Sequence, residues 1–171
     1  MEKKQKIFIY GLDYAGKTSV VETMKQEETM SDANPTLSFN ISNYITENAT
    51  LQIWDAPGQK SLRDSWEKGY NRADILVFVL DTADMERYDE AYAEFKKVLD
   101  HQLARGLPLI FLFHKMDLEK ARANLKAAKD RFDLSAIKNR RVVSYYTSIY
   151  DLNSIKKFRS NLLDIVMGTM W

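Results

Sequence analysis

The chain of 171 residues contains no cysteine, so a disulfide framework, a thiolate metal site and a cysteine nucleophile are all excluded. It also has no apolar run that approaches the ~20 residues of a membrane-spanning helix. Its formal net charge is only +1, from 25 basic and 24 acidic side chains, and this balance gives no global field that would attract a nucleic acid. We therefore expect a soluble, cytoplasmic protein that does not bind nucleic acid.

The length and the 45% hydrophobic content are those of one domain with a real core, and no repeat or low-complexity linker divides the chain. A single domain over residues 1–171 is expected. The start, Met1-Glu2-Lys3-Lys4, offers neither a signal-peptide core nor the second-position glycine that myristoylation needs. Basic clusters such as Lys156-Lys157-Arg159 leave two interpretations open: peripheral contact with an anionic membrane, or plain solvated surface.

Short β-rich runs alternate with longer helical patterns along the chain, which is typical of a parallel sheet with crossover helices. Strands are expected at residues 6–10, 38–45, 51–55, 74–81, 109–113 and 142–146, and helices at 19–25, 85–105, 119–131 and from about 151. The second and third strands are close enough in sequence to form a hairpin. The pattern predicts an α/β fold with a mostly parallel six-stranded sheet and helices on both faces. The helix at 119–131 is expected to be a polar surface helix. A three-to-four spacing predicts core residues in the helix at 85–105 and in the last helix: Tyr88, Tyr92, Phe95, Leu99 and Leu103, and Ile155, Phe158, Leu162 and Ile165.

Residues 11–18, Gly-Leu-Asp-Tyr-Ala-Gly-Lys-Thr, match the pattern G-x-x-x-x-G-K-[ST]. The glycines let successive backbone N–H groups turn inward on phosphates, the lysine supplies a positive charge, and the threonine hydroxyl is a magnesium ligand. A predicted strand precedes this loop and a predicted helix follows it, as the motif requires. A glycine-rich turn is the alternative, but the context favours a P-loop NTPase that binds a nucleoside triphosphate.

Two further motifs follow predicted strands: Trp54-Asp55-Ala56-Pro57-Gly58-Gln59 and His114-Lys115-Met116-Asp117. Because ligands of open α/β sheets bind at the carboxyl ends of the strands, these motifs and the phosphate loop are expected at one site. Asp117 is suited to accept hydrogen bonds from the guanine ring N–H and exocyclic amine, which adenine does not offer in that arrangement. The alternative for Asp117 is a helix-capping aspartate.

At these residues the chain resembles the Ras-like small GTPases, and among them most closely the Arf family. The residues that carry the resemblance are Gly11-Leu12-Asp13, residues 35–40 (Pro-Thr-Leu-Ser-Phe-Asn), Trp54-Asp55 and Gly58-Gln59, while residues 114–118 and 147–149 look like the corresponding loops of Rag GTPases. The resemblance covers almost the whole chain. It implies a G domain that binds GTP or GDP with Mg²⁺ and acts as a molecular switch under exchange factors, GTPase-activating proteins and effectors.

The resemblance also implies a role for each matching residue. The implied nucleotide-binding residues are Asp13, Tyr14, Ala15, Gly16, Lys17, Thr18, Ser19, Thr36, Gly58, His114, Lys115, Asp117, Ser148 and Ile149. Thr18 and Thr36 are the implied magnesium ligands, and Asp55 acts through water. Thr36 is expected to reach Mg²⁺ only when the γ-phosphate is present, and the Gly58 N–H is expected to donate a hydrogen bond to that phosphate. Loss of the γ-phosphate would release both segments, which is the implied switch.

The remaining implied roles concern the base and the reaction. Lys115 is expected to lie along the base and ribose, and the Ser148 and Ile149 backbone is expected to meet the guanine carbonyl oxygen. Gln59 matches the catalytic glutamine that positions the attacking water, and hydrolysis by the isolated chain is expected to be slow. Arg63 is either an arginine finger that acts in cis or a surface residue, and the surface role is favoured.

Phe39 and Trp54 match two of the three aromatic residues through which Arf effectors bind, and Tyr70 stands one position beyond the third. An effector surface at these three residues is expected. The resemblance does not extend to the myristoylated amphipathic helix of Arf proteins or to the carboxy-terminal domain of Rag proteins, because only about six residues precede the first predicted strand and the chain ends at Trp171.

Two departures from the family pattern carry their own hypotheses. Pro57 stands where a small flexible residue is usual. Proline fixes its own φ and lacks an N–H, so the segment that follows Asp55 and contains Pro57, Gly58 and Gln59, here called the second switch, is expected to be stiffer. His114 stands where most small GTPases carry asparagine. Its imidazole either donates a hydrogen bond to guanine N7 or the phosphate-loop backbone, which makes affinity depend on pH near neutrality, or it only packs.

Two functions from different classes remain open from the sequence. The first is a GTP-hydrolysing switch, which the intact Lys17, Thr36 and Gln59 favour. The second is a nucleotide-locked scaffold whose GTP mainly stabilises a heterodimer. A third, an ATP-using P-loop kinase, is disfavoured by Lys115 and Asp117.

Overall fold

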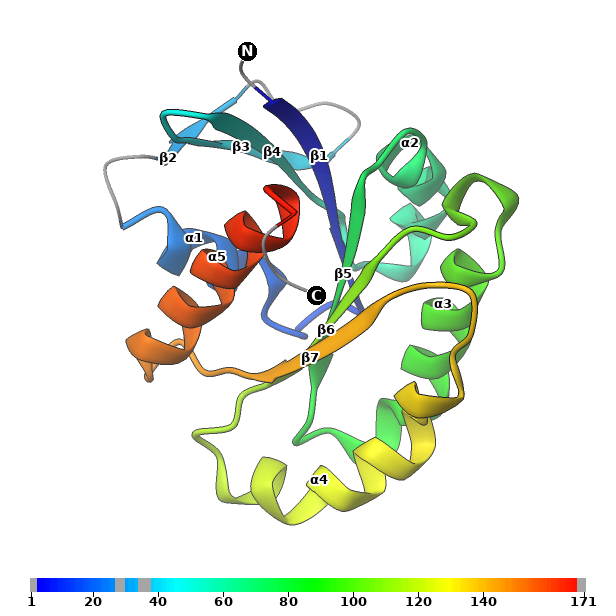
Figure 1. Cartoon of the computed structure of the whole chain (residues 1–171). Helices are drawn as coiled ribbons and strands as arrows, with labels where there is room; N and C mark the ends of the chain where they lie inside the picture. Colours follow the sequence, from blue (N-terminus) through cyan, green and yellow to red (C-terminus); the bar gives the residue numbers. More distant parts are fainter. Residues whose placement is uncertain (1–2, 27–29, 34–37, 169–171) are drawn as a thin grey trace.

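The computed structural model describes residues 3–26, 30–33 and 38–168. Its centre is a sheet with the strand order β2-β3-β4-β1-β5-β6-β7 (Figure 1). The strands are β1 (Lys3–Tyr10), β2 (Met30–Asp32), β3 (Asn40–Ile45), β4 (Ala49–Asp55), β5 (Ile75–Asp81), β6 (Leu109–His114) and β7 (Val142–Tyr146). The helices are α1 (Lys17–Met24), α2 (Trp66–Tyr70), α3 (Tyr88–Leu99), α4 (Glu119–Phe132) and α5 (Leu152–Val166).

The predicted α/β class with a mostly parallel sheet is confirmed, because β4, β1, β5, β6 and β7 all pair in parallel. The predicted number of six strands is wrong, since the sheet has seven. The additional strand is β2, which pairs antiparallel with β3 from Met30 opposite Tyr44 to Asp32 opposite Ser42. It has three residues, of which only Met30 is buried, so neither its length nor its pattern gives a strand signal. The predicted hairpin of β3 and β4 is present.

The helices cover both faces of the sheet, with α1 and α5 on one face and α2, α3 and α4 on the other (Figure 1). Alternate residues of β1 explain this layering. Ile7 and Ile9 pack into the core beneath α1 and α5, whereas Phe8 and Tyr10 pack into the core beneath α2 and α3. The central strands β5 and β6 are buried on both faces, which is why their sequences are continuous apolar runs.

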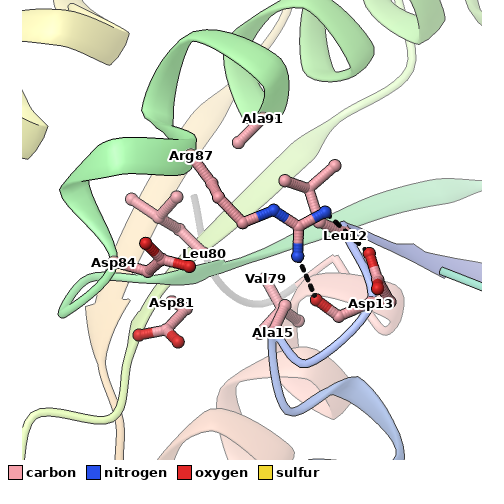
Figure 2. Close-up of a pocket in the computed structure, with 9 residues that line it drawn as sticks. All are labelled: Leu12, Asp13, Ala15, Val79, Leu80, Asp81, Asp84, Arg87 and Ala91. Carbon is pink, nitrogen blue, oxygen red and sulfur yellow. Dashed lines mark hydrogen bonds and ion pairs between the residues drawn. The ribbon is translucent and has the colours of Figure 1, made fainter. Parts of the chain in front are cut away.

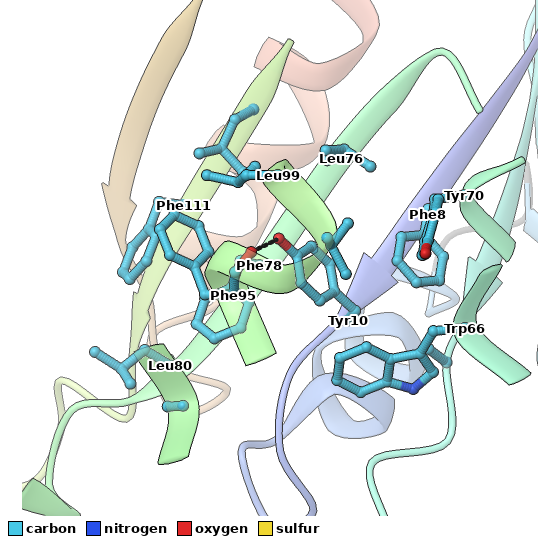
Figure 3. Packing of buried hydrophobic residues seen from close by; sticks show 14 of the residues in the cluster. Phe8, Tyr10, Trp66, Tyr70, Leu76, Phe78, Leu80, Phe95, Leu99 and Phe111 are labelled. Atoms are coloured by element: carbon cyan, nitrogen blue, oxygen red, sulfur yellow. Dashed lines mark hydrogen bonds between the residues drawn. The ribbon is translucent and has the colours of Figure 1, made fainter. Parts of the chain in front are cut away.

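The core under α2 and α3 is built mainly from aromatic rings (Figure 3). The Tyr10 ring centroid lies 5.4 Å from that of Trp66 and 5.0 Å from that of Phe78, and Phe78 lies 4.9 Å from Phe95. The Tyr10 hydroxyl donates a hydrogen bond of 3.2 Å to the carbonyl oxygen of Phe95, and burial raises the pKa of this phenol. Each aromatic pair adds about 0.5–1.5 kcal/mol beyond its buried area. These contacts fix α2 and α3 against β1, directly before the phosphate loop.

The helix predicted over residues 85–105 is divided in the structure. A short 3-10 helix, Met85–Arg87, precedes α3, and α3 itself ends at Leu99. His101 is extended, and its Nδ1 accepts a hydrogen bond from the Leu103 N–H, which caps a second 3-10 helix, Gln102–Ala104. Leu103, which the helical spacing places on the buried face, is therefore 37% exposed.

The two carboxy-terminal helices agree better with the sequence. The predicted core residues of α5 are all buried: Ile155, Phe158, Leu162 and Ile165. Helix α4 carries a polar outer face, as predicted, and buries Ala121, Asn124, Ala128 and Phe132 against the domain. Across residues 3–26, 30–33 and 38–168, no helix combines the length and the apolar character that crossing a membrane requires.

Candidate nucleotide-binding site

The phosphate loop connects the end of β1 to the start of α1, so the predicted order of strand, loop and helix is confirmed. Gly16 adopts φ +100°, and a Cβ at this position would lie 2.7 Å from the His114 ring, so only glycine fits. Tyr14 also has a positive φ of 64°, and its side chain is 84% exposed at the rim of the loop. Ala15 is buried beneath the loop, and Ser19 is exposed on the first turn of α1.

Lys17 is buried at the base of this loop. Its Nζ donates a hydrogen bond of 2.8 Å to the Leu12 carbonyl oxygen. Burial lowers the pKa of Lys17 to about 8, while the nearby Asp55 carboxylate acts in the opposite direction. An ammonium held in this way by a single backbone oxygen retains donors for a phosphate.

Asp55 and Thr18 lie together at the ends of β4 and the phosphate loop. The Thr18 hydroxyl donates a hydrogen bond of 2.8 Å to Asp55 Oδ2, and the carboxyl is 2% exposed. Burial raises the pKa of Asp55, and the hydrogen bond from Thr18 lowers it in part. Asp55 Oδ1 is buried and accepts no hydrogen bond from the described residues. A free buried carboxylate oxygen beside a hydroxyl fits a hard cation such as Mg²⁺. Thr36, the other predicted ligand, lies outside the described residues.

The segment after β4 packs directly on the phosphate loop. The Gly58 carbonyl oxygen accepts hydrogen bonds from the Asp13 N–H (3.1 Å) and from Arg63 Nε (2.9 Å). A Cβ on Gly58 would lie 2.5 Å from the Asp13 nitrogen and 2.6 Å from Lys17 Nζ, so a side chain cannot be accommodated here. Gln59 directly precedes a 3-10 helix, Lys60–Ser65, and is exposed. Its carbonyl oxygen accepts a hydrogen bond from the Leu62 N–H.

Pro57 is held in place from α2, because its carbonyl oxygen accepts a 2.7 Å hydrogen bond from Trp66 Nε1. The preceding Ala56 N–H donates to the Ile9 carbonyl oxygen of β1 at 2.9 Å. The second switch is thus anchored on both sides of Pro57, which agrees with the expectation that this segment is stiff.

Lys115 joins the predicted base-binding motif to the phosphate loop. Its Nζ donates to the Tyr14 carbonyl oxygen at 2.7 Å and pairs with Asp81 Oδ2 at 2.9 Å. Sequence reasoning missed Asp81, although its position was the signal: it ends β5 and lies opposite His114 of β6 in the register. These two contacts direct the lysine across the loop.

Asp117 is exposed, and its Oδ1 accepts a 2.8 Å hydrogen bond from the buried Ser148 hydroxyl. The Ser148 N–H donates to Ser154 Oγ at 3.1 Å, and the role of the Ser148 backbone at the guanine carbonyl stays a prediction. Within the part of the chain that the structure describes, the Ile149 N–H makes no backbone hydrogen bond. The contact of Ile149 with the guanine carbonyl likewise stays a prediction.

His114 is 2% exposed beneath Gly16, and its Nδ1 lies 2.8 Å from the Thr147 hydroxyl. Burial, followed by the positive charge of Lys115, lowers the pKa of His114 to about 4. The ring is therefore neutral at physiological pH, and the alternative of packing is favoured over titration near neutrality.

Arg63 is not the surface residue that the sequence favours. Its side chain is 4% exposed and lies 2.8 Å from Glu90 Oε2 and 3.3 Å from Asp13 Oδ1. Arg87, which precedes α3, donates from Nη2 to Asp13 Oδ1 (2.7 Å) and from Nη1 to the Asp13 carbonyl oxygen (3.0 Å), as Figure 2 shows. Sequence reasoning missed Arg87 and Glu90, because neither lies in a recognisable motif.

The predicted effector surface also needs correction. Phe39 is fully buried and Tyr70 almost so, and only Trp54 keeps part of its surface exposed. The cause is Gly69: a Cβ there would lie within 2.6 Å of both the Phe8 and Phe39 rings, so these rings occupy the space that a larger residue would fill. The outer face presents Trp54, with Lys6 Nζ 4.0 Å above its ring.

Residues 1–166 match the model of the ADP-ribosylation factor family. The chain belongs to this family. It is 34% identical over 139 residues to ADP-ribosylation factor-like protein 3 of Chlamydomonas reinhardtii, covering 81% of this chain and 77% of that protein. It is 38% identical over 120 residues to ADP-ribosylation factor-like protein 2 of Arabidopsis thaliana, covering 70% and 64% respectively.

Among solved structures, the fold is similar to the Arl6 BBS3 small GTPase of Trypanosoma brucei with the bound nucleotide analogue GppNp. The TM-score is 0.81 at 22% identity, over 98% of this chain and 99% of that chain. ADP-ribosylation factor family members are small GTPases, so the predicted Ras-like, Arf-like membership is confirmed. The Rag-like character of the base-binding loops stays a prediction.

Proposed function

We propose that this chain is a molecular switch that binds GTP or GDP with Mg²⁺ and hydrolyses GTP slowly, as a single G domain over residues 1–171. The observation that carries the proposal is the meeting of three motifs on the phosphate loop. Gly58 contacts Asp13 from the second switch, and Lys115 contacts Tyr14 from the base-binding motif. The segments proposed to contact the phosphates and the base of a nucleotide are therefore hydrogen-bonded to the same phosphate loop.

Selectivity for guanine follows from the fixed carboxylate of Asp117. The Ser148 hydroxyl holds Oδ1 from below, which orients the exposed carboxylate toward incoming N–H donors. Guanine offers its ring N–H and its exocyclic amine to this group. Adenine would cover the carboxylate without offering those donors, and a charged acceptor that loses water without a partner costs about 1–3 kcal/mol or more. We expect GDP and GTP to bind far more tightly than ADP and ATP.

Thr18, Thr36 and Asp55 are the residues that would hold Mg²⁺, which supplies charge neutralisation on the phosphates when bound. The chain's own contribution is the Thr18 hydrogen bond, which lowers the pKa of Asp55 against the larger opposite effect of burial, and the Leu12 carbonyl oxygen that holds Lys17 at the loop. Gln59 is the proposed residue that orients the attacking water. Its exposed position, and the engagement of Arg63 elsewhere, support slow intrinsic hydrolysis that an arginine supplied by an activating protein accelerates.

We further propose that the protein works in the cytoplasm, free or peripheral to membranes, under an exchange factor and an activating protein, and that it controls trafficking or signalling through an effector. The exposed part of Trp54 is the element of the predicted aromatic surface that remains available for an effector.

Single-turnover GTP hydrolysis by the wild type and by Gln59→Leu tests the proposal. The variant should bind GTP normally and lose at least about tenfold in rate, because it cannot orient water. Equal rates would instead favour a nucleotide-locked dimerisation scaffold.

A further inference from the structure

A cluster of four charged side chains joins the second switch, the phosphate loop and the start of α3. Arg63 comes from the second switch, Asp13 from the phosphate loop, and Arg87 and Glu90 from the α3 side. Arg87 is paired to both acids, at 2.7 Å from Asp13 Oδ1 and 3.0 Å from Glu90 Oε2 (Figure 2 shows its contact with Asp13). Glu94 extends the cluster at 3.8 Å from Arg63.

Within this cluster the Arg63 side chain and the Asp13 backbone both contact the peptide next to Gln59. Arg63 Nε donates to the Gly58 carbonyl oxygen at 2.9 Å, and the Asp13 N–H donates to the same oxygen at 3.1 Å. In a trans peptide the carbonyl and the following N–H point in opposite directions in one plane. Two donors on the Gly58 oxygen therefore fix the orientation of the Gly58–Gln59 peptide and the point from which the Gln59 side chain starts.

The two ends of the Arg63 guanidinium have different partners. Nε donates to the Gly58 carbonyl oxygen, and Nη2 donates to Asp13 Oδ1 at 3.3 Å. Nη1 forms an ion pair with Glu90 Oε2 at 2.8 Å and has no hydrogen-bond partner among the described residues. The planar guanidinium makes these contacts simultaneously, whereas a lysine ammonium is a single point of charge on a flexible stem. Two nitrogens donate hydrogen bonds and the third is paired with Glu90 by charge, so the Arg63 side chain is held inside the domain in this arrangement.

We propose that Arg63 is a positioning residue for Gln59, and that Glu90 and Asp13 hold it in place, so that the α3 side of the domain sets the rate of GTP hydrolysis. This inference rests on the proposed function of Gln59. It predicts that weakening the Arg63 contacts changes hydrolysis more than nucleotide affinity, because Arg63 does not contact the base-binding residues Lys115 or Asp117. Arg87 also holds Asp13, at the shorter distance of 2.7 Å.

The test compares Arg63→Lys, Glu90→Gln and the double variant with Arg140→Gln as control. Arg140 is a partly buried arginine at the far end of α3, where it donates to the carbonyl oxygens of Leu99, Ala104 and Leu107. Loss of these hydrogen bonds in Arg140→Gln should lower thermal stability without changing the conformation of the second switch. Single-turnover hydrolysis and GDP dissociation are measured for every variant.

Arg63→Lys should slow hydrolysis by about tenfold or more, because small displacements of a reacting group are costly, and should leave GDP dissociation within about twofold. Glu90→Gln should slow hydrolysis less, and the double variant should be no slower than Arg63→Lys, since both changes act through one contact chain. Hydrolysis by Arg63→Lys within about twofold of wild type, or an equal loss in Arg140→Gln, would overturn the proposal.

A second readout separates this inference from the proposed hydrolysis itself. Amide hydrogen exchange over residues 58–62 should be faster in Arg63→Lys than in the wild type by about tenfold, and unchanged in Arg140→Gln, whether or not the protein hydrolyses GTP. If the wild type binds GTP but does not cleave it, the proposed function fails while this measurement still decides the positioning role. Unchanged exchange in Arg63→Lys would rule that role out.

Discussion

Lys115 Nζ lies 2.7 Å from the Tyr14 carbonyl oxygen, so the base-binding motif and the phosphate loop are joined by a charge-assisted hydrogen bond. Asp81 holds the same ammonium from β5 at 2.9 Å. The two predicted ends of the nucleotide site are thereby joined through one lysine, and a contact of this kind lowers the cost of ordering a site on binding.

Replacing Lys115 with Met should accelerate GDP dissociation by about ten- to a hundredfold, the equivalent of the about 1.5–3 kcal/mol that a hydrogen bond from a charged group contributes. Stopped-flow release of a fluorescent GDP analogue measures this. Lys120→Met, an exposed lysine of α4 outside the site, is the matched control and should leave the rate unchanged. Equal rates for wild type and Lys115→Met would mean that the contact with Tyr14 does not stabilise the bound state.

Asp117→Asn should exchange base specificity. The amide replaces one acceptor by an N–H donor, so the exocyclic amine of guanine loses its partner while the corresponding oxygen of xanthine gains one. Calorimetric titration with GDP and with xanthosine diphosphate should show GDP weakened by about tenfold or more and the xanthine nucleotide strengthened. Retention of wild-type GDP affinity would argue that Asp117 caps α4 instead of reading the base.

The buried His114 predicts a particular pH dependence. Its pKa is lowered to about 4 in the folded state, from 6.5 in the unfolded chain, so the unfolded state takes up the proton first as the pH falls. The contribution of neutral, buried His114 to the free energy of unfolding is fully present above about pH 6.5. It is lost as the pH falls toward about 4, and the total loss is about 3 kcal/mol. GDP affinity should be flat between about pH 5.5 and 8, because the ring stays neutral there.

His114→Asn removes the titrating group and should flatten the acid side of the stability curve, which denaturant unfolding at several pH values measures. His101→Gln serves as the control for the loss of a histidine, since His101 lies just beyond α3 and away from the site. A pH-dependent GDP affinity near neutrality that disappears in His114→Asn would instead show that the imidazole titrates against the ligand.

Pro57→Gly should change the kinetics of the second switch. The glycine adds backbone freedom at a segment that Trp66 Nε1 holds through the Pro57 carbonyl, and the unfolded chain gains about 0.4–1 kcal/mol of entropy. We expect altered exchange or hydrolysis rates with the fold intact, checked by the fluorescence of Trp66 and by single-turnover assays. Unchanged kinetics would dismiss the idea that Pro57 stiffens the switch.

The sequence predicted well those features that lie in one continuous stretch. The apolar run of β5 and the spacing of Ile155 and Phe158 on α5 indicated their elements correctly, because burial imposes a period on neighbouring residues. It missed β2, whose three residues are too few to show a period.

Contacts between distant segments explain the remaining errors. The ion pair of Arg63 with Glu90 joins residues 27 positions apart in the numbering, and nothing in either local sequence indicates it. The buried Phe39 ring packs where a side chain at Gly69 would lie, and no local sequence pattern indicates a contact between these two residues. In both cases tertiary packing decided what motif matching assigned to the surface.

The central claim is that one site at the carboxyl ends of the strands binds a guanine nucleotide. Isothermal titration of the nucleotide-stripped protein with GDP and with ADP, each with Mg²⁺, tests it most directly. The account predicts one tight site for GDP and no measurable heat with ADP. No heat with GDP, or equal affinity for the two nucleotides, would contradict it.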